Sequence, residues 1–107
     1  MPGANGAPSS LSLDCSGRLI ARRTVFIGTL TSSLVHPREI FADPLADHAA
    51  EVIIAHNHPS GDEDPSEDDY TTTQQLVAAG KILGIPVRDH VIVAEAKHYS
   101  FKKNGLV

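Results

Sequence analysis

The sequence contains a single cysteine, Cys15, and this scarcity excludes two kinds of protein. One thiol cannot form a disulfide within the chain, and it cannot supply a zinc module built from several cysteines. A chain without disulfides is typical of a reducing compartment. We therefore expect a cytoplasmic protein.

Long hydrophobic runs and a targeting segment are also missing. No stretch approaches the roughly 18 apolar residues of a membrane span, so we expect no association with a membrane. Residues 1–10 have neither the basic start nor the apolar centre of a signal peptide. We interpret them as a disordered leader and expect one small domain over residues 11–107.

Positive charge is scarce as well. Nine Lys and Arg residues stand against thirteen Asp and Glu, and the formal net charge is −4. The basic residues are scattered, with adjacent pairs only at residues 22–23 and 102–103. Proteins that bind duplex DNA neutralise its phosphates with clustered Lys and Arg. The composition therefore argues against direct, tight binding of nucleic acid.

The first half of the chain has the pattern of strands with one helical interruption. Residues 10–14 and 18–30 alternate or are rich in β-branched residues, with turn residues between them, and predict a hairpin. Pro37 and Pro44 punctuate the next segment, so we expect any helix there to be short or broken. Residues 51–56, EVIIAH, form a continuous apolar run of strand length, which is typical of a strand buried on both faces.

The second half changes to a helical period. From Ser66 onward, apolar and small residues recur at steps of three and four, and Gly84 followed by Pro86 predicts the end of the helix. Residues 86–94 and 98–103 then predict two further strands. The expected order is β-β-(short helix)-β-α-β-β around one sheet, an α/β fold.

Potential metal ligands are most concentrated in residues 55–70, AHNHPSGDEDPSEDDY. His56 and His58 are two residues apart at the end of the predicted strand, so both imidazoles project to the same side. Asp69 lies in the first turn of the following helix, where a carboxylate is favoured by the helix dipole and can face the strand end. Two histidines and a carboxylate are zinc ligands with bonds of about 2.0–2.2 Å, and three protein ligands leave a fourth position for water.

The same residues also have structural explanations. Ser66 and Asp69 by themselves form a variant of the capping box at a helix start. The other acidic residues between Asp62 and Asp68 are typical of a solvated loop. Asp89 and His90, in a predicted strand, fit a core pair or a support for a ligand better than a fourth ligand.

Three other motifs share some of these letters but fail on spacing. An HNH nuclease takes its His, Asn and His from positions far apart in the chain. A calcium loop beginning at Asp62 would need Gly at its sixth position and Glu at its twelfth, where Glu67 and Thr73 stand. A zinc deaminase needs a Pro-Cys-x-x-Cys segment, which one cysteine cannot provide.

His56, His58, Ser66 and Asp69 fill the pattern His-x-His, seven residues, Ser, two residues, Asp. This pattern resembles the JAMM signature of MPN-type zinc metallopeptidases. More narrowly, HNHPSGDEDPSEDD resembles the version found in the bacterial RadC proteins, also called JAB-type domains. The flanking segments LSLDCSGRLIARRTVFIGTLTSSLVHPREIF and LVAAGKILGIPVRDHVIV, with YSF, are similar to the same family, so the resemblance covers about residues 11–103.

The resemblance implies a fold, a metal site and an activity. The fold would be an α/β sandwich around a mixed β-sheet flanked by helices, with zinc at the end of a central strand. His56, His58 and Asp69 would bind the zinc ion, and Ser66 would stabilise the oxyanion formed when zinc-activated water attacks a carbonyl. The implied activity is hydrolysis of a peptide or isopeptide amide in a peptide or protein substrate.

One element of the family pattern is not found. JAMM enzymes use a glutamate as general base, and in RadC-like chains it precedes the segment that matches SLSLD. No glutamate precedes Glu39 in this sequence. The chain therefore resembles a RadC domain trimmed at its N-terminus, with impaired activity, and Glu39 is the candidate substitute base.

Two other functions stay open. The missing glutamate favours a non-catalytic, zinc-stabilised module that binds a protein partner. An accessory role in DNA repair is suggested by the label of the RadC family, although the acidic composition speaks against direct DNA binding.

Overall fold

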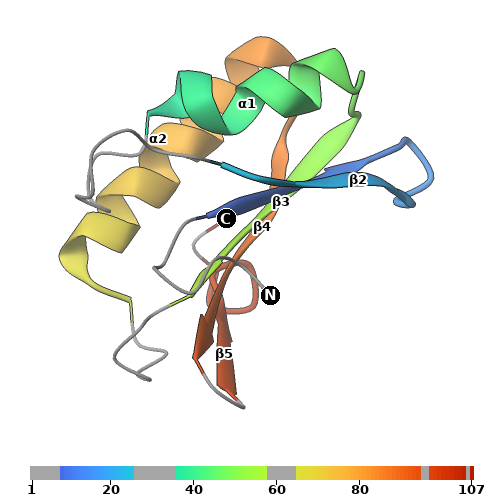
Figure 1. The fold of residues 1–107 in the computed structure, drawn as a ribbon. Coiled ribbons are helices and arrows are strands. Elements are labelled where there is room, and N and C mark those ends of the chain that lie inside the picture. The colour runs from blue at the N-terminus through green and yellow to red at the C-terminus, as the bar shows by residue number, and fades with distance from the viewer. Residues whose placement is uncertain (1–7, 26–35, 58–64, 95–96, 106) are drawn as a thin grey trace.

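The computed structural model describes residues 8–25, 36–57, 65–94, 97–105 and 107. In these ranges the chain forms five strands and two helices (Figure 1): β1 (Ser9–Leu13), β2 (Leu19–Thr24), α1 (Pro37–Ala46), β3 (Glu51–Asn57), α2 (Glu67–Leu83), β4 (Val87–Ala94) and β5 (Lys97–Ser100). The order of elements is the predicted one, and the α/β class is confirmed.

The five strands form one mixed sheet in the order β2-β1-β3-β4-β5. β3 and β4 run parallel, and the other three pairs of neighbours are antiparallel. A parallel pair needs a crossover connection, and α2 lies within the one that joins β3 to β4. β3 is therefore the central strand, and its carboxyl end lies beside the loop that leads to α2.

The predicted hairpin is present over β1 and β2. The turn is closed by the side chain of Asp14, whose Oδ1 accepts hydrogen bonds from the backbone N–H groups of Ser16 and Arg18. Ser9 and Ser10, which the sequence placed in the leader, are fully buried residues of β1. Residues 26–30 of the predicted second strand lie outside the described residues.

Helix α1 is continuous over ten residues, although Pro44 lies inside it. Pro37 stands at the start of the helix, where a missing N–H group costs little. Pro44 comes two residues before the end, so only one backbone hydrogen bond of the helix is lost to it. The sequence predicted a helix that is short or broken, and α1 is the short, unbroken one. Ile40 and Phe41 on this helix are buried in the core and hold it on the sheet.

Strand β3 is fully buried on only one of its faces. Val52 and Ile54 are 0% and 1% exposed, whereas Ile53 and Ala55 between them are partly exposed. The expectation that both faces of this strand are buried was therefore wrong, since an unbroken apolar run conceals the alternation of the two faces. The face of Val52 and Ile54 packs on both helices in one core, with Ile40, Phe41 and Leu76 as helix members.

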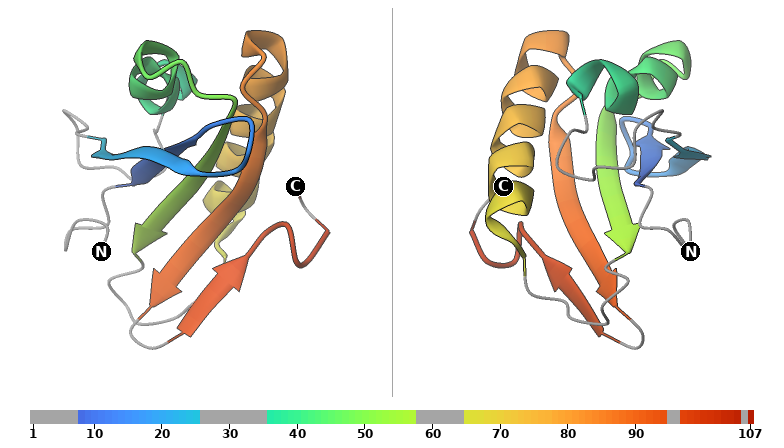
Figure 2. Two further views of the ribbon diagram at one scale, coloured as in Figure 1. Left: turned by 90° about the vertical axis from the view of Figure 1, so that its right-hand side faces the viewer. Right: turned by 60° about the vertical axis from the view of Figure 1, so that its left-hand side comes forward.

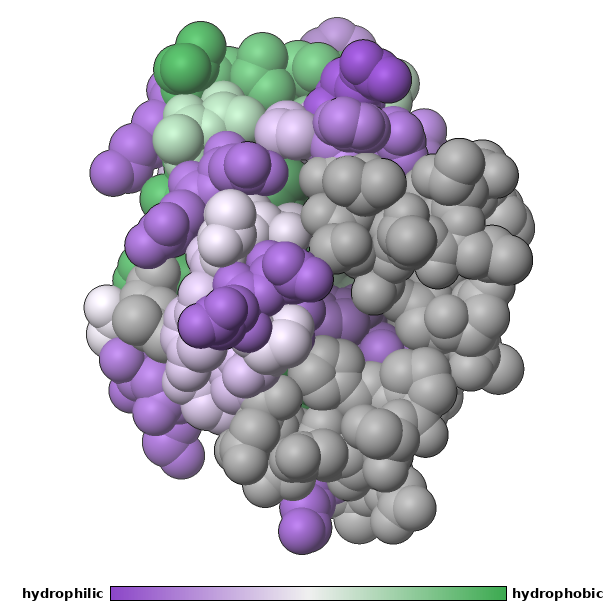
Figure 3. Space-filling model, turned by 90° about the vertical axis from the view of Figure 1, so that its left-hand side faces the viewer, coloured by the Kyte–Doolittle hydropathy of each residue, from purple (hydrophilic) through white to green (hydrophobic). Residues whose placement is uncertain are grey.

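Helix α2 begins after Ser66 and ends at Gly84, as predicted. Gly84 has a φ of 76°, a left-handed conformation that glycine adopts without the clash that a Cβ atom would cause. In Figure 3, hydrophobic residues gather at the upper left of the described surface, and polar residues lie at the upper right, in the centre and at the lower left. Within the described ranges, no helix is long and apolar enough to span a membrane.

Gly80 allows the end of α2 to pack closely on its neighbours. A Cβ atom at this position would lie 2.6 Å from the carbonyl oxygen of Ile85 and 3.3 Å from Cζ of Phe41. Gly80→Ala should therefore lower the free energy of unfolding by about 1–2 kcal/mol, because overpacking costs more than the helix gains from alanine. Urea unfolding measures this change.

The matched control is Gln74→Ala, at an exposed position of the same helix. This variant should stay within about 0.5 kcal/mol of the parent protein. A Gly80→Ala protein as stable as the parent would contradict the close packing.

Candidate metal centre

The end of β3 and the first turn of α2 meet at one end of the molecule (Figures 1 and 2). His56 is the residue before the last of β3, and Asp69 is the third residue of α2. Nε2 of His56 lies 3.3 Å from Oδ1 of Asp69. The two side chains are 13% and 16% exposed, so the pair is shielded from bulk water and still reachable from it.

This separation suits a tetrahedral metal ion. Two ligands with bonds of about 2.0–2.1 Å, placed at the tetrahedral angle, are about 3.3–3.4 Å apart. A charge-assisted hydrogen bond between the same two atom types is usually shorter, at about 2.7–2.9 Å. Imidazole nitrogen and carboxylate oxygen are both ordinary zinc ligands. The geometry of His56 and Asp69 therefore fits two corners of the centre expected from the sequence.

The start of α2 fixes the carboxylate of Asp69. The hydroxyl oxygen of Ser66 accepts a hydrogen bond from the backbone N–H of Asp69, at 3.1 Å, and Oδ2 of Asp69 accepts one from the backbone N–H of Ser66, at 2.8 Å. This is the capping box that the sequence offered as a structural explanation. It occupies Oδ2, whereas Oδ1 faces His56, so capping and metal binding use different oxygens.

Asp69 has a perturbed acidity. Burial by itself would raise the pKa of its carboxyl group, because the charged form loses hydration. The contact with His56 and the hydrogen bond from Ser66 outweigh burial and hold the pKa of Asp69 well below its usual value. The group is therefore ionised at neutral pH, the form that a metal ligand needs.

The other ring nitrogen of His56 contacts a second histidine. Nδ1 of His56 lies 2.9 Å from Nε2 of His90, which is 2% exposed and comes from β4. Nδ1 of His90 lies 2.5 Å from the hydroxyl oxygen of Thr73 on α2. The Thr73 hydroxyl in turn donates to the backbone carbonyl oxygen of Asp69, at 2.7 Å. These contacts form a closed loop that begins and ends at Asp69.

The turn after β5 holds the ring of His90 in place. Phe101 stacks on His90 with a centroid distance of 4.6 Å and an interplanar angle of 11°. Asp89 anchors the turn that carries Phe101: its carboxylate accepts hydrogen bonds from the Ser100 hydroxyl and the Lys102 backbone N–H. Asp89 and His90 thus both support the site, and of these two only His90 contacts a predicted ligand within the described ranges.

Thr73 is the residue of this cluster that the sequence analysis did not single out. It appeared there only as a position of the helical period. The available signal was a hydroxyl residue at a core-facing position four residues after Asp69, which places both on one face of the helix. Its side chain is 2% exposed, and a buried hydroxyl is expected to find hydrogen-bond partners.

Three other residues were predicted for the site: His58, Ser66 and Glu39. His58 lies outside the described residues. Ser66 is exposed at the start of α2. Glu39 lies in the first turn of α1, which packs on β1 and α2, and its Oε2 is buried without a hydrogen-bond partner in the described part of the chain.

The complete ligand set is not present among the described residues. In that part of the chain, no group of three or more His, Cys, Asp or Glu side chains that could hold a metal ion is found. His56 and Asp69 supply two of the three predicted ligands, and His58 is the third. The ligand set and the role of Glu39 as a base therefore stay predictions.

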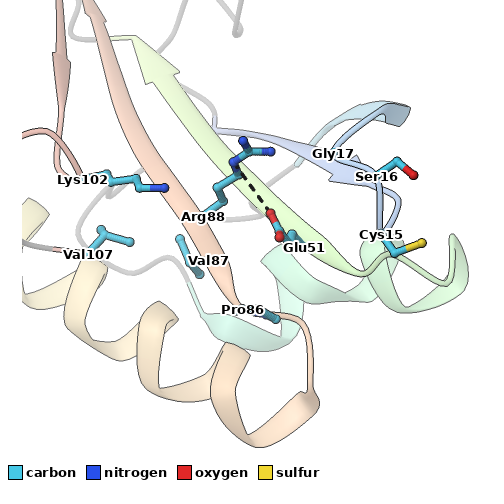
Figure 4. A pocket seen from close by; sticks show the side chains of 9 residues that line it. All are labelled: Cys15, Ser16, Gly17, Glu51, Pro86, Val87, Arg88, Lys102 and Val107. Atoms are coloured by element: carbon cyan, nitrogen blue, oxygen red, sulfur yellow. Dashed lines mark ion pairs between the residues drawn. The ribbon is translucent and has the colours of Figure 1, made fainter.

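A pocket of about 540 Å³ lies at the opposite end of β3, where this strand begins (Figure 4). An ion pair between Glu51 and Arg88, 3.8 Å apart, stands in its wall. None of the predicted site residues that the structure describes lines this pocket. The chemistry expected from the sequence is therefore at the carboxyl end of β3 and not in this pocket.

A family profile described as "RadC-like JAB domain" matches residues 8–106. The chain belongs to the RadC-like JAB domain family. The family resemblance found from the HNHPSGDEDPSEDD segment and its flanks is thus confirmed.

Curated relatives include UPF0758 proteins from three bacteria. The protein from Desulforamulus reducens is 47% identical over 98 residues, which cover 92% of this chain and 43% of the relative. That from Syntrophomonas wolfei is 48% identical over 97 residues (91% and 41%), and that from Bacillus cereus is 47% identical over 95 residues (89% and 42%). The chain spans less than half the length of each of these relatives.

Proposed function

We propose that this RadC-like JAB domain is a zinc-dependent hydrolase of peptide or isopeptide amides. The proposal is supported above all by the 3.3 Å separation between Nε2 of His56 and Oδ1 of Asp69, which matches the edge of a zinc tetrahedron. A zinc ion bound there would polarise a carbonyl oxygen and lower the pKa of a water molecule.

In this proposal some side chains bind the metal ion and others hold its ligands in position. His56, His58 and Asp69 hold the metal ion. The capping box with Ser66 fixes the Asp69 carboxylate, and His90 contacts the far side of the His56 ring. Such supporting contacts reduce the reorganisation that metal binding requires.

Ser66 has a second role in this proposal. Its hydroxyl oxygen accepts the N–H of Asp69 and retains its own proton for donation. It stands at the N-terminus of α2, where the helix dipole favours negative charge. A substrate carbonyl oxygen near Asp69 would receive this proton as a hydrogen bond while negative charge develops on it.

Hydrolysis of an amide-linked substrate by the zinc-loaded protein, with and without a chelator, tests the proposal. Chelator-sensitive turnover that is lost in His56→Ala supports the enzyme. Zinc binding without turnover, both in this chain and in a chain that carries the family glutamate, would favour the alternative, a zinc-stabilised module that binds a protein partner.

The alternative of an accessory role in DNA repair leads to a separate prediction about binding to duplex DNA. Because the chain carries a net charge of −4 and its basic residues are scattered, binding to duplex DNA should be weak and should vanish at about 0.15 M salt. A gel-shift series at low and physiological salt measures this. Submicromolar affinity that persists at the higher salt concentration would reject the expectation.

A further inference from the structure

The pocket at the start of β3 is built by distant parts of the chain. Its wall includes residues 15–17 from the turn between β1 and β2, the starts of β3 and β4, and Lys102 and Val107 near the end of the chain. Its volume of about 540 Å³ is in the range of small-molecule sites, about 300–1,000 Å³. Glu51 in its wall lies five residues before His56 on β3, which is about 17 Å along the strand. The pocket is therefore separate from the proposed metal centre.

The guanidinium group of Arg88 has hydrogen-bond donors to offer in this pocket. Its Nε atom lies 3.8 Å from Oε2 of Glu51, which is too long for a hydrogen bond, so the two form an ion pair only. Among the described residues, no hydrogen bond from the Arg88 side chain is found. A guanidinium carries five N–H donors in a planar fork that fits a carboxylate in a bidentate manner. A ligand in the pocket can therefore use these donors.

Lys102 brings a second positive charge to the same pocket. Figure 4 shows its ammonium group pointing toward Arg88. The backbone N–H of Lys102 donates to Oδ1 of Asp89, which fixes the position of the residue. In the part of the chain that the structure describes, the side chain of Lys102 forms no ion pair with an acidic group. One anionic ligand can therefore interact with both cations.

Gly17 brings the turn between β1 and β2 close to Arg88. A Cβ atom at position 17 would lie 2.9 Å from Nη1 of Arg88, and Gly17 has a φ of 79°, which suits glycine. The carboxylate of Asp14 closes this turn through the backbone N–H groups of Ser16 and Arg18. The guanidinium therefore lies between a fixed turn and the carboxylate of Glu51, in a defined position.

The charge of the pocket indicates which kind of anion fits. Arg88 and Lys102 contribute two positive charges and Glu51 one negative charge, so the wall carries a net charge of about +1 in a chain whose formal charge is −4. A carboxylate would neutralise it, whereas a phosphate group, with about −1.5 to −2, would leave an excess of negative charge. The apolar part of the wall consists of Pro86, Val87 and Val107. A carboxylate on an apolar body matches both features.

We infer that this pocket binds an apolar monocarboxylate, either a small acid or the C-terminal residue of a peptide, through Arg88 and Lys102. The inference goes beyond the proposed hydrolase and does not depend on a metal ion. All of its tests use the metal-free 107-residue chain, so that a carboxylate cannot bind to zinc instead.

Titration with N-acetyl-leucine at low salt, followed in ¹⁵N–¹H spectra, tests the inference. The backbone signals of residues 16, 17, 88 and 102 should shift in a saturable manner, and those of His56 and Asp69 should not. Arg88→Gln and Lys102→Gln should each weaken binding about fivefold or more, because each removes a charged partner at an exposed site. Lys103→Gln makes the same change in net charge at an exposed residue outside the pocket, and it should bind within about twofold of the parent.

Three further probes define the ligand. N-acetyl-leucinamide has the same apolar body without the charge and should not bind at the same concentrations. Inorganic phosphate should bind more weakly than N-acetyl-leucine. A five-residue peptide that ends in leucine with a free carboxylate distinguishes the two sources: binding at least as tight as that of N-acetyl-leucine assigns the pocket to peptide ends, and weaker binding assigns it to free acids.

Cys15 provides a second readout, because it is the single cysteine of the chain, is exposed and lines the pocket. Anionic iodoacetate and neutral iodoacetamide both react with its thiolate, so the ratio of their rates reports the local charge and not the thiolate content. The iodoacetate-to-iodoacetamide ratio should fall about twofold or more in Arg88→Gln and Lys102→Gln and should stay unchanged in Lys103→Gln. N-acetyl-leucine should slow both reactions.

Several results would overturn the inference. The carboxylate is not recognised if N-acetyl-leucinamide binds as tightly as the acid, or if the acid gives no saturable shifts at the pocket residues. Net charge alone is the cause if Lys103→Gln weakens binding as much as Lys102→Gln. An iodoacetate-to-iodoacetamide ratio that is equal in the parent and all three variants also contradicts it. Failure of the proposed hydrolase would leave each of these measurements unaffected.

Discussion

Supplied with zinc, the purified protein should hold about one zinc ion per chain, and His56→Ala or Asp69→Ala should reduce the zinc content to nearly none. Each substitution leaves two of the three proposed protein ligands, which is too few for a stable zinc site. His56 and Asp69 are the pair whose ligand atoms already lie 3.3 Å apart. Elemental analysis after dialysis against metal-free buffer measures the content.

Asp68→Asn is the matched control for the zinc measurement. It removes a carboxylate directly beside Asp69, but the side chain of Asp68 is exposed and the proposal assigns it no ligand role. Zinc content should stay near that of the parent. If the His56 and Asp69 variants retain as much zinc as Asp68→Asn, the proposed centre is in the wrong place.

Amide hydrolysis should be barely detectable in the 107-residue chain and should rise by about 10²–10⁴-fold when a family glutamate is supplied. The family resemblance implies a glutamate general base ahead of β1, and the printed sequence has no glutamate before Glu39. The experiment joins the corresponding segment of a UPF0758 relative to the chain before Ser9. Turnover is then compared at equal zinc content.

Two further variants make this comparison decisive. The extended chain with its added glutamate changed to glutamine should lose the gain, because the graft would then differ from the active form in one proton acceptor only. If the unextended chain already shows robust, chelator-sensitive turnover, Glu39→Gln should abolish it, since Glu39 would be the acting base. A folded, zinc-bound, extended chain that gains nothing would reject the enzyme in favour of the binding module.

The start of α2 could be predicted closely from the sequence because its cause is local. Ser66 and Asp69 are three residues apart, so the capping box needs no distant partner. Gly84 likewise ends the helix through its own backbone freedom. The order of elements followed from such local signals together with the hydrophobic period.

Local signals did not predict which face of β3 is buried or whether α1 is continuous. Residues 52–55, VIIA, are all apolar, yet only the face with Val52 and Ile54 is covered by the helices. Pro37 and Pro44 left open whether α1 is short or broken, and burial of the helix against the sheet keeps it continuous. In both cases the deciding contacts come from residues distant in the sequence.

The sequence by itself determined the family pattern. It also predicted that His56 and Asp69 are neighbours in space, because only a short segment separates the end of the strand from the start of the helix. Only the tertiary structure decided which side chains contact His56 on the side of its ring away from Asp69. His90 reaches His56 through the parallel pairing of β3 with β4, and Thr73 reaches His90 because α2 packs across that pair. These contacts join three separate elements, and no local pattern in the chain encodes the distances between those elements.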